Sequence, residues 1–521
     1  MPLSASSIFA AVGASVENVQ FQSSAEVLPR KVLIIATYDP AKTAVIDETP
    51  VLVTSEADAG DQFGFGFMAH RLAVQAFLGS QGVETWIQPQ SESGGAAAAT
   101  GDIDFTGSVP VANSTIYLYV AGIPVPTDIL STDADTVIAT KVVAAVALNT
   151  SLPVTAVVNG VTAGQVDFTA KSKGPWGNGI SLTFNWGAKE LTPTGIVAVV
   201  TDMASGTGTP DIDDALNGLG INDDQNEDFY TDIINGYGNV TTELDKLSVY
   251  NGVGNGFTGN YAKLVSRPFR VLAGDVTAGS GGLSALIAVG DGRKTDRTNG
   301  IIANPGSPNH PEEIAAMAIG IMARLNDNRA QESTIGQIMP GIIPGLKADR
   351  WTSSYSSNDT ALKAGISPIV VKNGACIMQN VASFYHPDSV PTSSNGYRSM
   401  RNISIIQNFL YNITLNFSQA KWQGISIVSD VTKVSNATDR EKARDIDSVI
   451  DDLLALAVSF EGHSWIFTAA FTIEKLQAGG AVAIRAGGTG FDSTLSVLLS
   501  GEGGIFDTNT QFDTSLAVLL Q

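Results

Sequence analysis

Two glycines bracket a phenylalanine in DQFGFGFMAH (residues 61–70), between a strand-like and a helix-like run. Glycine-rich loops at such junctions can wrap backbone N–H groups around a phosphate. A dinucleotide fingerprint needs a third glycine, in the order G-x-G-x-x-G, but Phe67, Met68 and Ala69 follow Gly66. The phenylalanines would also surround a phosphate with apolar surface. The segment therefore favours a tight structural corner over a nucleotide site.

A second candidate phosphate loop is VGDGRKTD (residues 289–296), where a lysine and a threonine follow a glycine. Arg293 separates Gly292 from Lys294, so the spacing of a P-loop is broken. The following DRTNG indicates a turn where a P-loop would begin a helix. This segment is also interpreted as a structural turn.

Other catalytic patterns are missing from the sequence. The four histidines, His70, His310, His386 and His463, have no metal-ligand spacing, and no G-x-S-x-G elbow occurs. The single cysteine, Cys376, lies in the apolar run ACIM and is expected to be a small buried side chain. The sequence therefore predicts no catalytic residue, no metal site and no cofactor, and the protein is not expected to be an enzyme.

Charge and hydropathy limit the partners. The 521 residues include 30 basic and 51 acidic side chains, a formal net charge of −21, and no basic run exceeds two residues. Binding to nucleic acid needs clustered lysine and arginine, so direct binding to DNA or RNA is not expected. No run approaches 18 apolar residues and no basic segment precedes the N-terminal apolar stretch, so neither membrane insertion nor a signal peptide is expected.

The elements around the glycine corner form a recognisable unit. RKVLIIATYD (30–39) predicts a strand buried on both faces, residues 67–82 a helix, and VETWIQPQ (83–90) a second strand. This β-α-β order predicts a parallel, right-handed crossover. From Ser91 onwards the sequence is rich in Val, Thr and Gly, which indicates an inserted α+β domain.

The second half of the chain alternates further elements. Residues 282–293 (GLSALIAVGDGR) are expected to form a buried strand, and NDDQNEDFYTDIINGYG (222–238) an acidic surface followed by a helix. Residues 309–327 predict a helix with Pro311 in its first turn. Residues 438–458 predict another, because Thr438 and Glu441 have capping-box spacing. Its expected exposed face holds four carboxylates, Asp445, Asp447, Asp451 and Asp452, which are most simply a solvated face.

The C-terminal region contains a strand-like run, AVAIRA (481–486), between two glycine pairs, Gly479–Gly480 and Gly487–Gly488. After it, FDSTLSVLLS (491–500) recurs as FDTSLAVLLQ (512–521). These segments have apolar residues, but the sequence shows no domain of their own in which these residues could be buried. One interpretation is that edge strands and a final helix pack on the same subunit, and the other is that they pair with a neighbouring subunit.

A series of short motifs extends along most of the chain. Its first half comprises VLIIATYD, FGFGFMAHRLAVQAF, VETWIQP, AAAATGDIDFTG, YLYVAGIPV and GPWGNGISLTF. Its second half comprises GDGR (290–293), PEEIAAMAIGIMA (311–323), ADRWT (348–352), ALKAGISPIVVKNGACIM (361–378) and YRSMRNISIIQNFLYNI (397–413). In order and spacing, over residues 25 to 470, the series resembles the contractile tail sheath protein of Mu-type bacteriophages. The C-terminal sequence and SFYHPDSVPTSSNG depart from the pattern.

The resemblance implies an α/β and α+β multidomain fold with a sheath-type core, a β-rich inserted domain and terminal arms that exchange strands. We expect an N-terminal arm, two parts of the core interrupted by an outer inserted domain, a C-terminal domain facing the tube and a C-terminal arm. Their expected boundaries are 1–28, 29–95, 96–235, 236–345, 346–478 and 479–521.

The resemblance further implies a structural subunit that polymerises helically around a tail tube and contracts to drive it through the host envelope. The implied partners are other copies of itself, the tail tube protein, and baseplate and tail-terminator proteins. The implied location is the virion, after assembly in the host cytoplasm. Asp445, Asp447, Asp451 and Asp452 are then candidates to face the tube, and Gly479, Gly480, Gly487 and Gly488 to act as arm hinges. The alternatives are the sheath of a pyocin-like device and a nucleotide-binding α/β enzyme.

Overall fold

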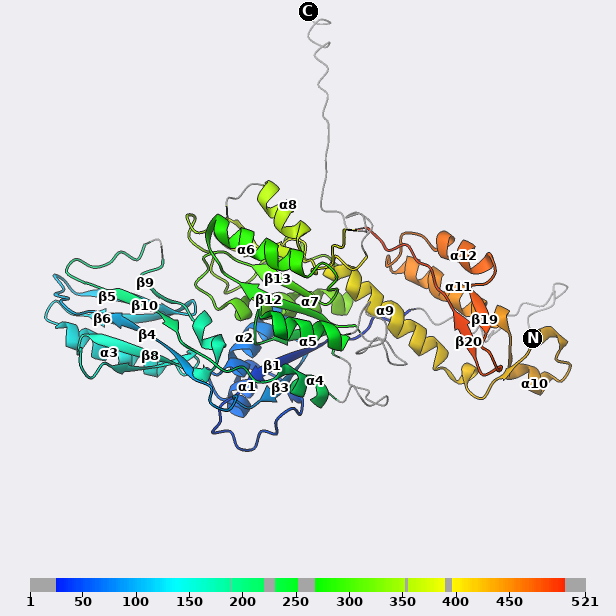
Figure 1. Cartoon of the computed structure of the whole chain (residues 1–521), viewed down its shortest axis with the longest axis horizontal. Helices are drawn as coiled ribbons and strands as arrows, with labels where there is room; N and C mark the ends of the chain where they lie inside the picture. Colours follow the sequence, from blue (N-terminus) through cyan, green and yellow to red (C-terminus); the bar gives the residue numbers. More distant parts are fainter. Residues whose placement is uncertain are drawn as a thin grey trace, which may run out of the picture. The chain divides into compact units, whose positions relative to one another are not determined.

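A computed structural model describes residues 25–187, 189–219, 230–251, 268–351, 355–388 and 396–501. By its internal contacts the chain divides into two compact units, each described separately below (Figure 1). The large unit comprises Val27–Leu410 and Gly501–Gln521, and the small unit Met1–Glu26 and Tyr411–Ser500. Helix α9 (Met400–Phe417) therefore contributes residues to both units.

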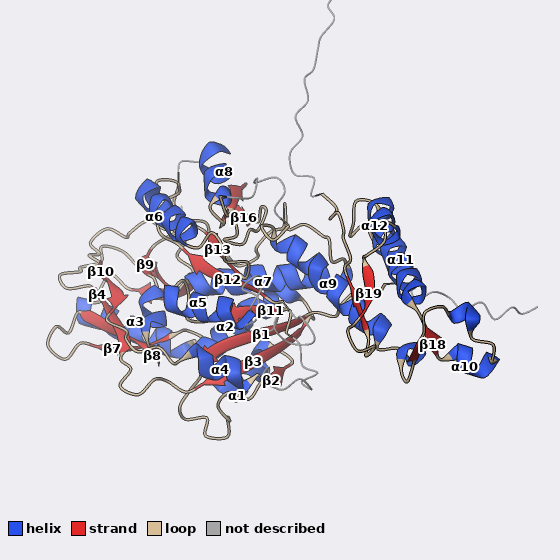
Figure 2. Ribbon diagram, turned by 45° about the vertical axis from the view of Figure 1, so that its right-hand side comes forward, coloured by secondary structure: helices blue, strands red, loops and turns tan. Residues whose placement is uncertain are grey.

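A seven-stranded sheet forms the centre of the large unit, in the order β14-β13-β12-β11-β1-β3-β2 (Figure 2). Every pairing in it is parallel except that between β2 and β3. The strands are β1 (Lys31–Thr37), β2 (Val51–Val53), β3 (Glu84–Gln90), β11 (Asp232–Asn235), β12 (Arg270–Asp275), β13 (Asn299–Ala303) and β14 (Ile366–Pro368). The predicted parallel β-α-β unit is confirmed, with Lys31 opposite Glu84 in register.

Helices cover both faces of this sheet, which explains why β1 has a continuous apolar sequence. Val32, Ile34 and Ala36 belong to the core shared with α2 and α7, whereas Leu33 and Ile35 belong to the core shared with α4 and α5. The helices described in the large unit include α1 (Glu56–Phe63), α2 (Met68–Ser80), α4 (Ile212–Gly218), α5 (Thr241–Asn251), α6 (Gly279–Gly292), α7 (Pro311–Asn328) and α8 (Tyr355–Lys363).

Two expectations were wrong in this unit. Residues 282–292 belong to a helix, α6, with Arg293 as its C-cap, and its buried residues Gly282, Leu286 and Gly290 recur every four positions. A Cβ on Gly290 would lie 1.9 Å from the carbonyl oxygen of Ala364, so this glycine permits close packing instead of marking a turn. The helix expected after residue 228 is instead the central strand β11, and residues 220–229 lie outside the described part of the chain.

The strands between β3 and β11 in the sequence form two antiparallel sheets, which are separate from the large sheet. One has the order β10-β4-β8-β7 and the other β6-β5-β9. They comprise β4 (Ala98–Asp104), β5 (Ser114–Val120), β6 (Ile123–Ile129), β7 (Val154–Val158), β8 (Gln165–Lys173), β9 (Leu182–Phe184) and β10 (Val199–Ala204), with α3 (Asp135–Leu148) and the short helix η1 (Pro175–Gly179). The expected mixture of strands and one helix is observed, while the boundaries 96–235 stay a prediction.

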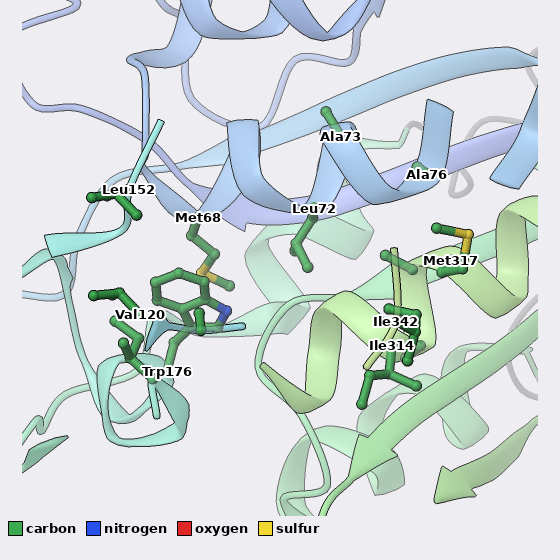
Figure 3. Close-up of a cluster of buried hydrophobic side chains, with 14 of the residues drawn as sticks. Met68, Leu72, Ala73, Ala76, Val120, Leu152, Trp176, Ile314, Met317 and Ile342 are labelled. Atoms are coloured by element: carbon green, nitrogen blue, oxygen red, sulfur yellow. The ribbon is translucent and has the colours of Figure 1, made fainter. Parts of the chain in front are cut away.

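One hydrophobic cluster joins side chains of α2, α7 and the antiparallel sheets (Figure 3). Within this cluster α2 and α7 approach closely at Gly79. A Cβ at this position would lie 2.5 Å from the Met317 carbonyl oxygen, so only glycine permits the approach. His310 caps α7 by accepting from the Glu312 amide, and its ring stacks on Trp176 at 4.4 Å. His310 is therefore a packed capping residue with no free ligand nitrogen, since Nε2 lies 2.8 Å from the Trp176 carbonyl oxygen.

The small unit combines helices with two short two-stranded sheets in its described residues (Figure 1). Its elements after the C-terminal part of α9 are η4 (Ala420–Trp422), β17 (Ser426–Ile427), η5 (Val431–Lys433), α10 (Ala437–Glu441), β18 (Ala443–Arg444), α11 (Ile446–Gly462), α12 (Ala469–Gln477), β19 (Val482–Ile484) and β20 (Phe491–Ser493). In the large unit, β15 (Val370–Lys372) and β16 (Ala375–Ile377) form a further hairpin, in which Cys376 is buried as expected.

Candidate functional site

The glycine corner connects two helices and has no room for a phosphate. Gly64 ends α1 with φ +96°, and Phe67 is the N-cap of α2. A Cβ on Gly66, where φ is +82°, would lie 2.2 Å from the carbonyl oxygen of Leu152. The first amide of α2, that of Met68, already donates to Ser172 Oγ at 2.9 Å. Backbone of the same chain therefore fills the place that a phosphate would need, and the side chain of Phe65 between the two glycines is 36% exposed.

The basic side chains of the second candidate loop bind carboxylates of the same chain. Arg293 pairs with Asp296 at 2.7 Å and with Asp245 at 2.6 Å, and Lys294 pairs with Asp388 at 2.9 Å. These ion pairs give both side chains a structural role. In the described part of the chain, no group of three or more His, Cys, Asp or Glu side chains could hold a metal ion, and no helix is long and apolar enough to cross a membrane.

The acidic helix of the small unit begins later than its sequence predicts. Residues 437–441 form the separate helix α10, capped by Asn436, so the expected capping box of Thr438 and Glu441 is wrong. Strand β18 then pairs with β17, and α11 starts at Ile446. The capping box of α11 is formed by Asp445 and Ser448.

Asp445 is buried and serves as this N-cap, so its expected place on an exposed face is wrong. Its Oδ1 accepts from the Ser448 amide, and its Oδ2 accepts from the Val431 amide, both at 2.9 Å. Burial raises the pKa of Asp445, but the hydrogen bonds from Val431 and Ser448 outweigh it and leave the pKa below its usual value. The carboxylate holds η5 against the start of α11.

Asp452 also has hydrogen-bond and ion-pair partners within the small unit. Its Oδ2 accepts from Trp422 Nε1 at 2.7 Å and from Asn416 Nδ2 at 2.9 Å, and lies 2.7 Å from Lys421 Nζ. The Asp452 side chain keeps only 20% of its surface exposed. Asn416, Lys421 and Trp422 were not predicted as partners, because nothing in the spacing of α9, η4 and α11 along the sequence indicates that they meet.

The other two candidates remain on the surface of α11. Asp447 and Asp451 are exposed and lie four residues apart, so they stand one turn from each other on the same face. Among the described residues neither carboxylate has a hydrogen-bond or ion-pair partner. Two like charges one turn apart repel each other slightly, so neither carboxylate is stabilised by the other, and the pair is available to a cationic partner.

The four candidate hinge glycines all have backbone conformations that favour glycine. Gly479 and Gly480 follow α12 with φ +84° and +79°, and Gly487 and Gly488 have φ +89° and +68°. The second pair forms the turn between β19 and β20, which pair with each other in antiparallel fashion. The strand that was expected to join a neighbouring subunit is thus paired within its own chain, and a hinge role for these glycines stays a prediction.

Comparison with known proteins identifies one sequence relative. No protein-family model matches the chain. Over 421 residues, 80% of each protein, the chain is 25% identical to the Mu-like prophage FluMu tail sheath protein of Haemophilus influenzae.

Two solved structures are also similar in part. One is a sheath tail protein of Desulfitobacterium hafniense (9% identity, 91% of this chain and 93% of the other, TM-score 0.42). The second is the sheath complex of an extracellular contractile injection system in its contracted state (7% identity, 98% and 99%, TM-score 0.46). Both TM-scores are below 0.5, so the structural similarity carries no weight beside the sequence similarity. The sequence relative confirms the resemblance of this chain to the contractile tail sheath proteins of Mu-type bacteriophages.

Proposed function

We propose that the protein is the structural subunit of a contractile phage tail sheath. Copies polymerise helically around the tail tube, and the polymer contracts to drive the tube through the host envelope for genome delivery. The observation that carries this function is the sequence similarity to a prophage tail sheath protein over 80% of both chains. The protein then resides in the virion after assembly in the host cytoplasm, and its further partners are baseplate and tail-terminator proteins. The sheath of a pyocin-like device is the nearest alternative.

The energy for contraction is stored in the packing of the subunits. The corner at Gly64 and Gly66 is filled by backbone, and the basic residues Arg293 and Lys294 are paired with carboxylates, so neither candidate phosphate loop supports nucleotide hydrolysis. Alternative packings of one protein commonly differ by a few kcal/mol. A gain of about 2 kcal/mol per subunit, multiplied over a few hundred subunits, releases hundreds of kcal/mol.

The contact with the tube is proposed at Asp447 and Asp451. The sheath has to hold the tube during assembly and release it during contraction, which suits charge-based contacts that water and salt can screen. The two exposed, unpaired carboxylates on one face of α11 meet this requirement, and basic side chains on the tube are their expected partners. Asp445 and Asp452 support this face from within the unit.

The antiparallel sheets are proposed to form a peripheral module within boundaries 96–235. Strands β4 to β10 pair only among themselves, whereas β11, at the end of these boundaries, belongs to the seven-stranded sheet. A chain in which a short linker replaces residues 96–209, which keeps α4 and β11 in place, is expected to polymerise still. A folded core that no longer polymerises would contradict the peripheral role.

The two ends of the chain, 1–28 and 479–521, are proposed to link neighbouring subunits. Each added strand of about 5 residues makes several backbone hydrogen bonds, each contributing about 0.5–1.5 kcal/mol net. Removal of residues 1–24 is expected to leave a folded subunit that does not polymerise. Normal tubes from this truncation would show that the N-terminal segment is not a connector.

Electron microscopy of the purified protein tests the proposed function. Long tubular polymers of uniform diameter are expected. A compact monomer that binds ATP or NAD would instead support the enzyme alternative.

A further inference from the structure

The large unit has a cleft of about 660 Å³ at the carboxyl ends of β13 and β14. Asn304 and Pro305, which follow β13, line it together with Ile369, which follows β14. The start of α6 and the residues around Trp351 complete its walls. In sheets of parallel strands, ligands commonly bind beyond the carboxyl ends of the strands. The volume is in the range of pockets that hold a drug-sized ligand, so a short peptide segment fits it and a single small ion does not fill it.

The charged side chains that line this cleft are cationic. Lys347 and Arg350 line it, whereas no Asp or Glu does so among the described residues. Lys347 is exposed and has no hydrogen-bond or ion-pair partner in the described part of the chain. Arg350 donates from Nε to the Gly345 carbonyl oxygen at 2.8 Å, which orients its guanidinium group and leaves the terminal nitrogens for a ligand. The cleft, defined by Lys347, Arg350 and Trp351, is called the basic cleft below.

The rest of the basic cleft suits the main chain of a peptide. Pro305 and Ile369 give it apolar walls, and Trp351 adds a buried ring. The indole Nε1 of Trp351 donates to the Thr277 carbonyl oxygen at 3.3 Å, so the ring has a fixed position. Apolar walls with a few converging polar groups are typical of sites that bind a ligand of this size.

The charge distribution of the chain indicates what this ligand is. The net charge of the chain is −21, and NDDQNED (222–228) contains four carboxylates and no basic residue. No seven-residue stretch elsewhere in the chain contains as many. The segment lies within residues 220–229, outside the described part of the chain, as do residues 352–354 after Trp351, which are uncharged. Complementary charges steer association and select which surfaces meet, so this acidic segment matches the basic cleft.

The acidic segment does not reach the basic cleft of its own chain. Through the register of β11, β12 and β13, Ile234 is level with Gly300. Tyr230, which follows the segment, lies four residues before Ile234. Asn304, in the cleft, lies four residues after Gly300, so the two are eight residues apart along the strands, about 26 Å. Asp223, the carboxylate farthest from Tyr230, is seven residues away, which is about 23–25 Å even for a fully extended chain.

The other end of the segment makes full extension towards the cleft impossible. A Cβ on Gly218, at the end of α4, would lie 2.3 Å from the Glu48 carbonyl oxygen and 2.8 Å from Gln88 Nε2. Gly218 is therefore held beside β3, which is four strands from β13, a lateral separation of about 19 Å. Because both flanks are held far from the cleft, a second chain has to supply the acidic segment.

We propose that the basic cleft binds the acidic segment, residues 222–228, of a second copy of this chain. The proposal rests on the proposed function, because the sheath polymer places copies next to one another. The cleft and the segment are different surfaces of the subunit, so the contact is head-to-tail, and such contacts produce an open filament when they do not close into a ring. The contact is charge-based, so it weakens as salt rises.

Peptide binding to soluble wild-type subunits tests the chemistry of the cleft without needing a polymer. Labelled GINDDQNEDF (220–229) is expected to bind at least fivefold more tightly at low salt than GINNNQNQNF, in which the four carboxylates are replaced by amides. The difference should shrink as salt rises. Fluorescence anisotropy measures both affinities. Equal affinities for the two peptides would overturn the proposal.

The same peptides distinguish the cleft from the rest of the surface. K347E/R350E is expected to lose the preference for the acidic peptide. The control K189E/R329E, which changes the net charge equally at two exposed residues outside the cleft, should keep it. K347E alone should lower the preference as well, and it leaves the Arg350 hydrogen bond to Gly345 intact. Undiminished preference in both cleft variants would also overturn the proposal.

A charge exchange tests the contact between copies. D223K/D224K/E227K changes the net charge of the segment from −4 to +2, and K347E/R350E reverses the cleft. Each variant alone is expected to give at least threefold less sedimentable polymer than wild type, and a chain with all five substitutions should recover to within twofold, because opposite charges meet again. A combined chain no better than either variant, while the wild-type protein forms tubes, would overturn the proposal and leave the sheath function intact. Absence of tubes from the wild-type protein would instead overturn the sheath function.

Discussion

Arg71 on α2 donates from Nε and from a terminal nitrogen to the two carboxylate oxygens of Glu313 on α7, each at 2.8 Å. Both side chains are buried, with 4% and 0% of their surface exposed. Removal of one partner of such a pair leaves a buried charge without compensation, which commonly costs about 3–5 kcal/mol. The pair therefore fixes how α2 and α7 pack in the large unit.

We predict that Glu313→Gln lowers the free energy of unfolding of the large unit by about 3 kcal/mol or more. The midpoint of urea unfolding measures this, and the exposed Glu56→Gln variant is the control. The double variant R71M/E313L is expected to recover most of the loss, because apolar replacement of both partners is often neutral. A loss below about 1 kcal/mol for Glu313→Gln would contradict the structural role.

The sequence correctly predicted the elements that have apolar residues at buried positions and polar residues at exposed positions. The run of β1 and the capped, striped α7 are examples, and both are confirmed. Strand β11 was missed because Asp232 and Asn235 occupy a central buried strand. They are tolerated there because Asp232 pairs with Arg270, which lies far along the sequence on β12.

The surroundings of the candidate tube-facing carboxylates were also predicted only in part, because some of their partners lie far away in the sequence. Helical spacing placed Asp447 and Asp451 on the exposed side of α11, and the structure agrees. The same spacing could not show that Trp422 and Lys421 bind Asp452, or that Val431 donates to Asp445. These are tertiary contacts, which one sequence does not contain as a local pattern.

Substitution at the glycine corner tests its steric function. Gly66→Ala is expected to destabilise the large unit more than Gly82→Ala does. Both positions have positive φ, which costs a side chain about 1–2 kcal/mol. A Cβ on Gly66 would also lie 2.2 Å from the Leu152 carbonyl oxygen, whereas a Cβ on Gly82 meets nothing within 4 Å. Equal thermal shifts for the two variants would show that close packing does not decide the corner.

The four carboxylates of α11 are expected to separate into two classes. Asp445→Ala should lower the stability of the small unit by about 0.5–2 kcal/mol through loss of the N-cap, and Asp452→Ala should also lower it, because Trp422 Nε1 loses its acceptor. D451K should leave stability within about 0.5 kcal/mol of wild type, as surface changes usually do, and D447K should cost about 0.3–1 kcal/mol, because Asp447 lies in the first turn of α11. Thermal unfolding measures both classes, and equal shifts in the two would contradict the division.

The same surface pair is expected to affect assembly with the tube. D447K/D451K should reduce the amount of sheath assembled on tubes, and D447N/D451N should reduce it less. Wild-type assembly should weaken as salt rises, since exposed charge pairs are screened. Sedimentation of tubes with bound sheath measures this. Wild-type levels of assembly with the lysine variant would refute α11 as the tube-facing surface.

Stability is expected to fall in mild acid through His70. Burial, with the nearby charges of Arg71 and Lys171, lowers the pKa of His70 from 6.5 to about 4. The unfolded chain binds a proton at this group below about pH 6.5, whereas the folded chain stays neutral and Nδ1 accepts from the Gly66 amide at 3.1 Å. The stability contribution is therefore complete above pH 6.5 and is lost as the pH falls towards 4. It amounts to roughly 3 kcal/mol.

His70→Gln is expected to flatten this dependence between pH 7 and pH 4. The measurement is the urea midpoint at several pH values, with the difference in slope from wild type as the readout. Burial also lowers the pKa of His310. The His70 variant is therefore expected to keep a smaller dependence of stability on pH, with the same sign. An unchanged slope in the His70 variant would contradict this assignment.

The central claim is that one subunit forms two helical assemblies, and the most direct measurement is cryo-electron microscopy of sheath on tubes before and after triggering. We predict a shorter and wider polymer after triggering, with the same number of subunits and with the tube released from contact with α11. A single fixed lattice in both samples, or a protein that never polymerises, would contradict the account.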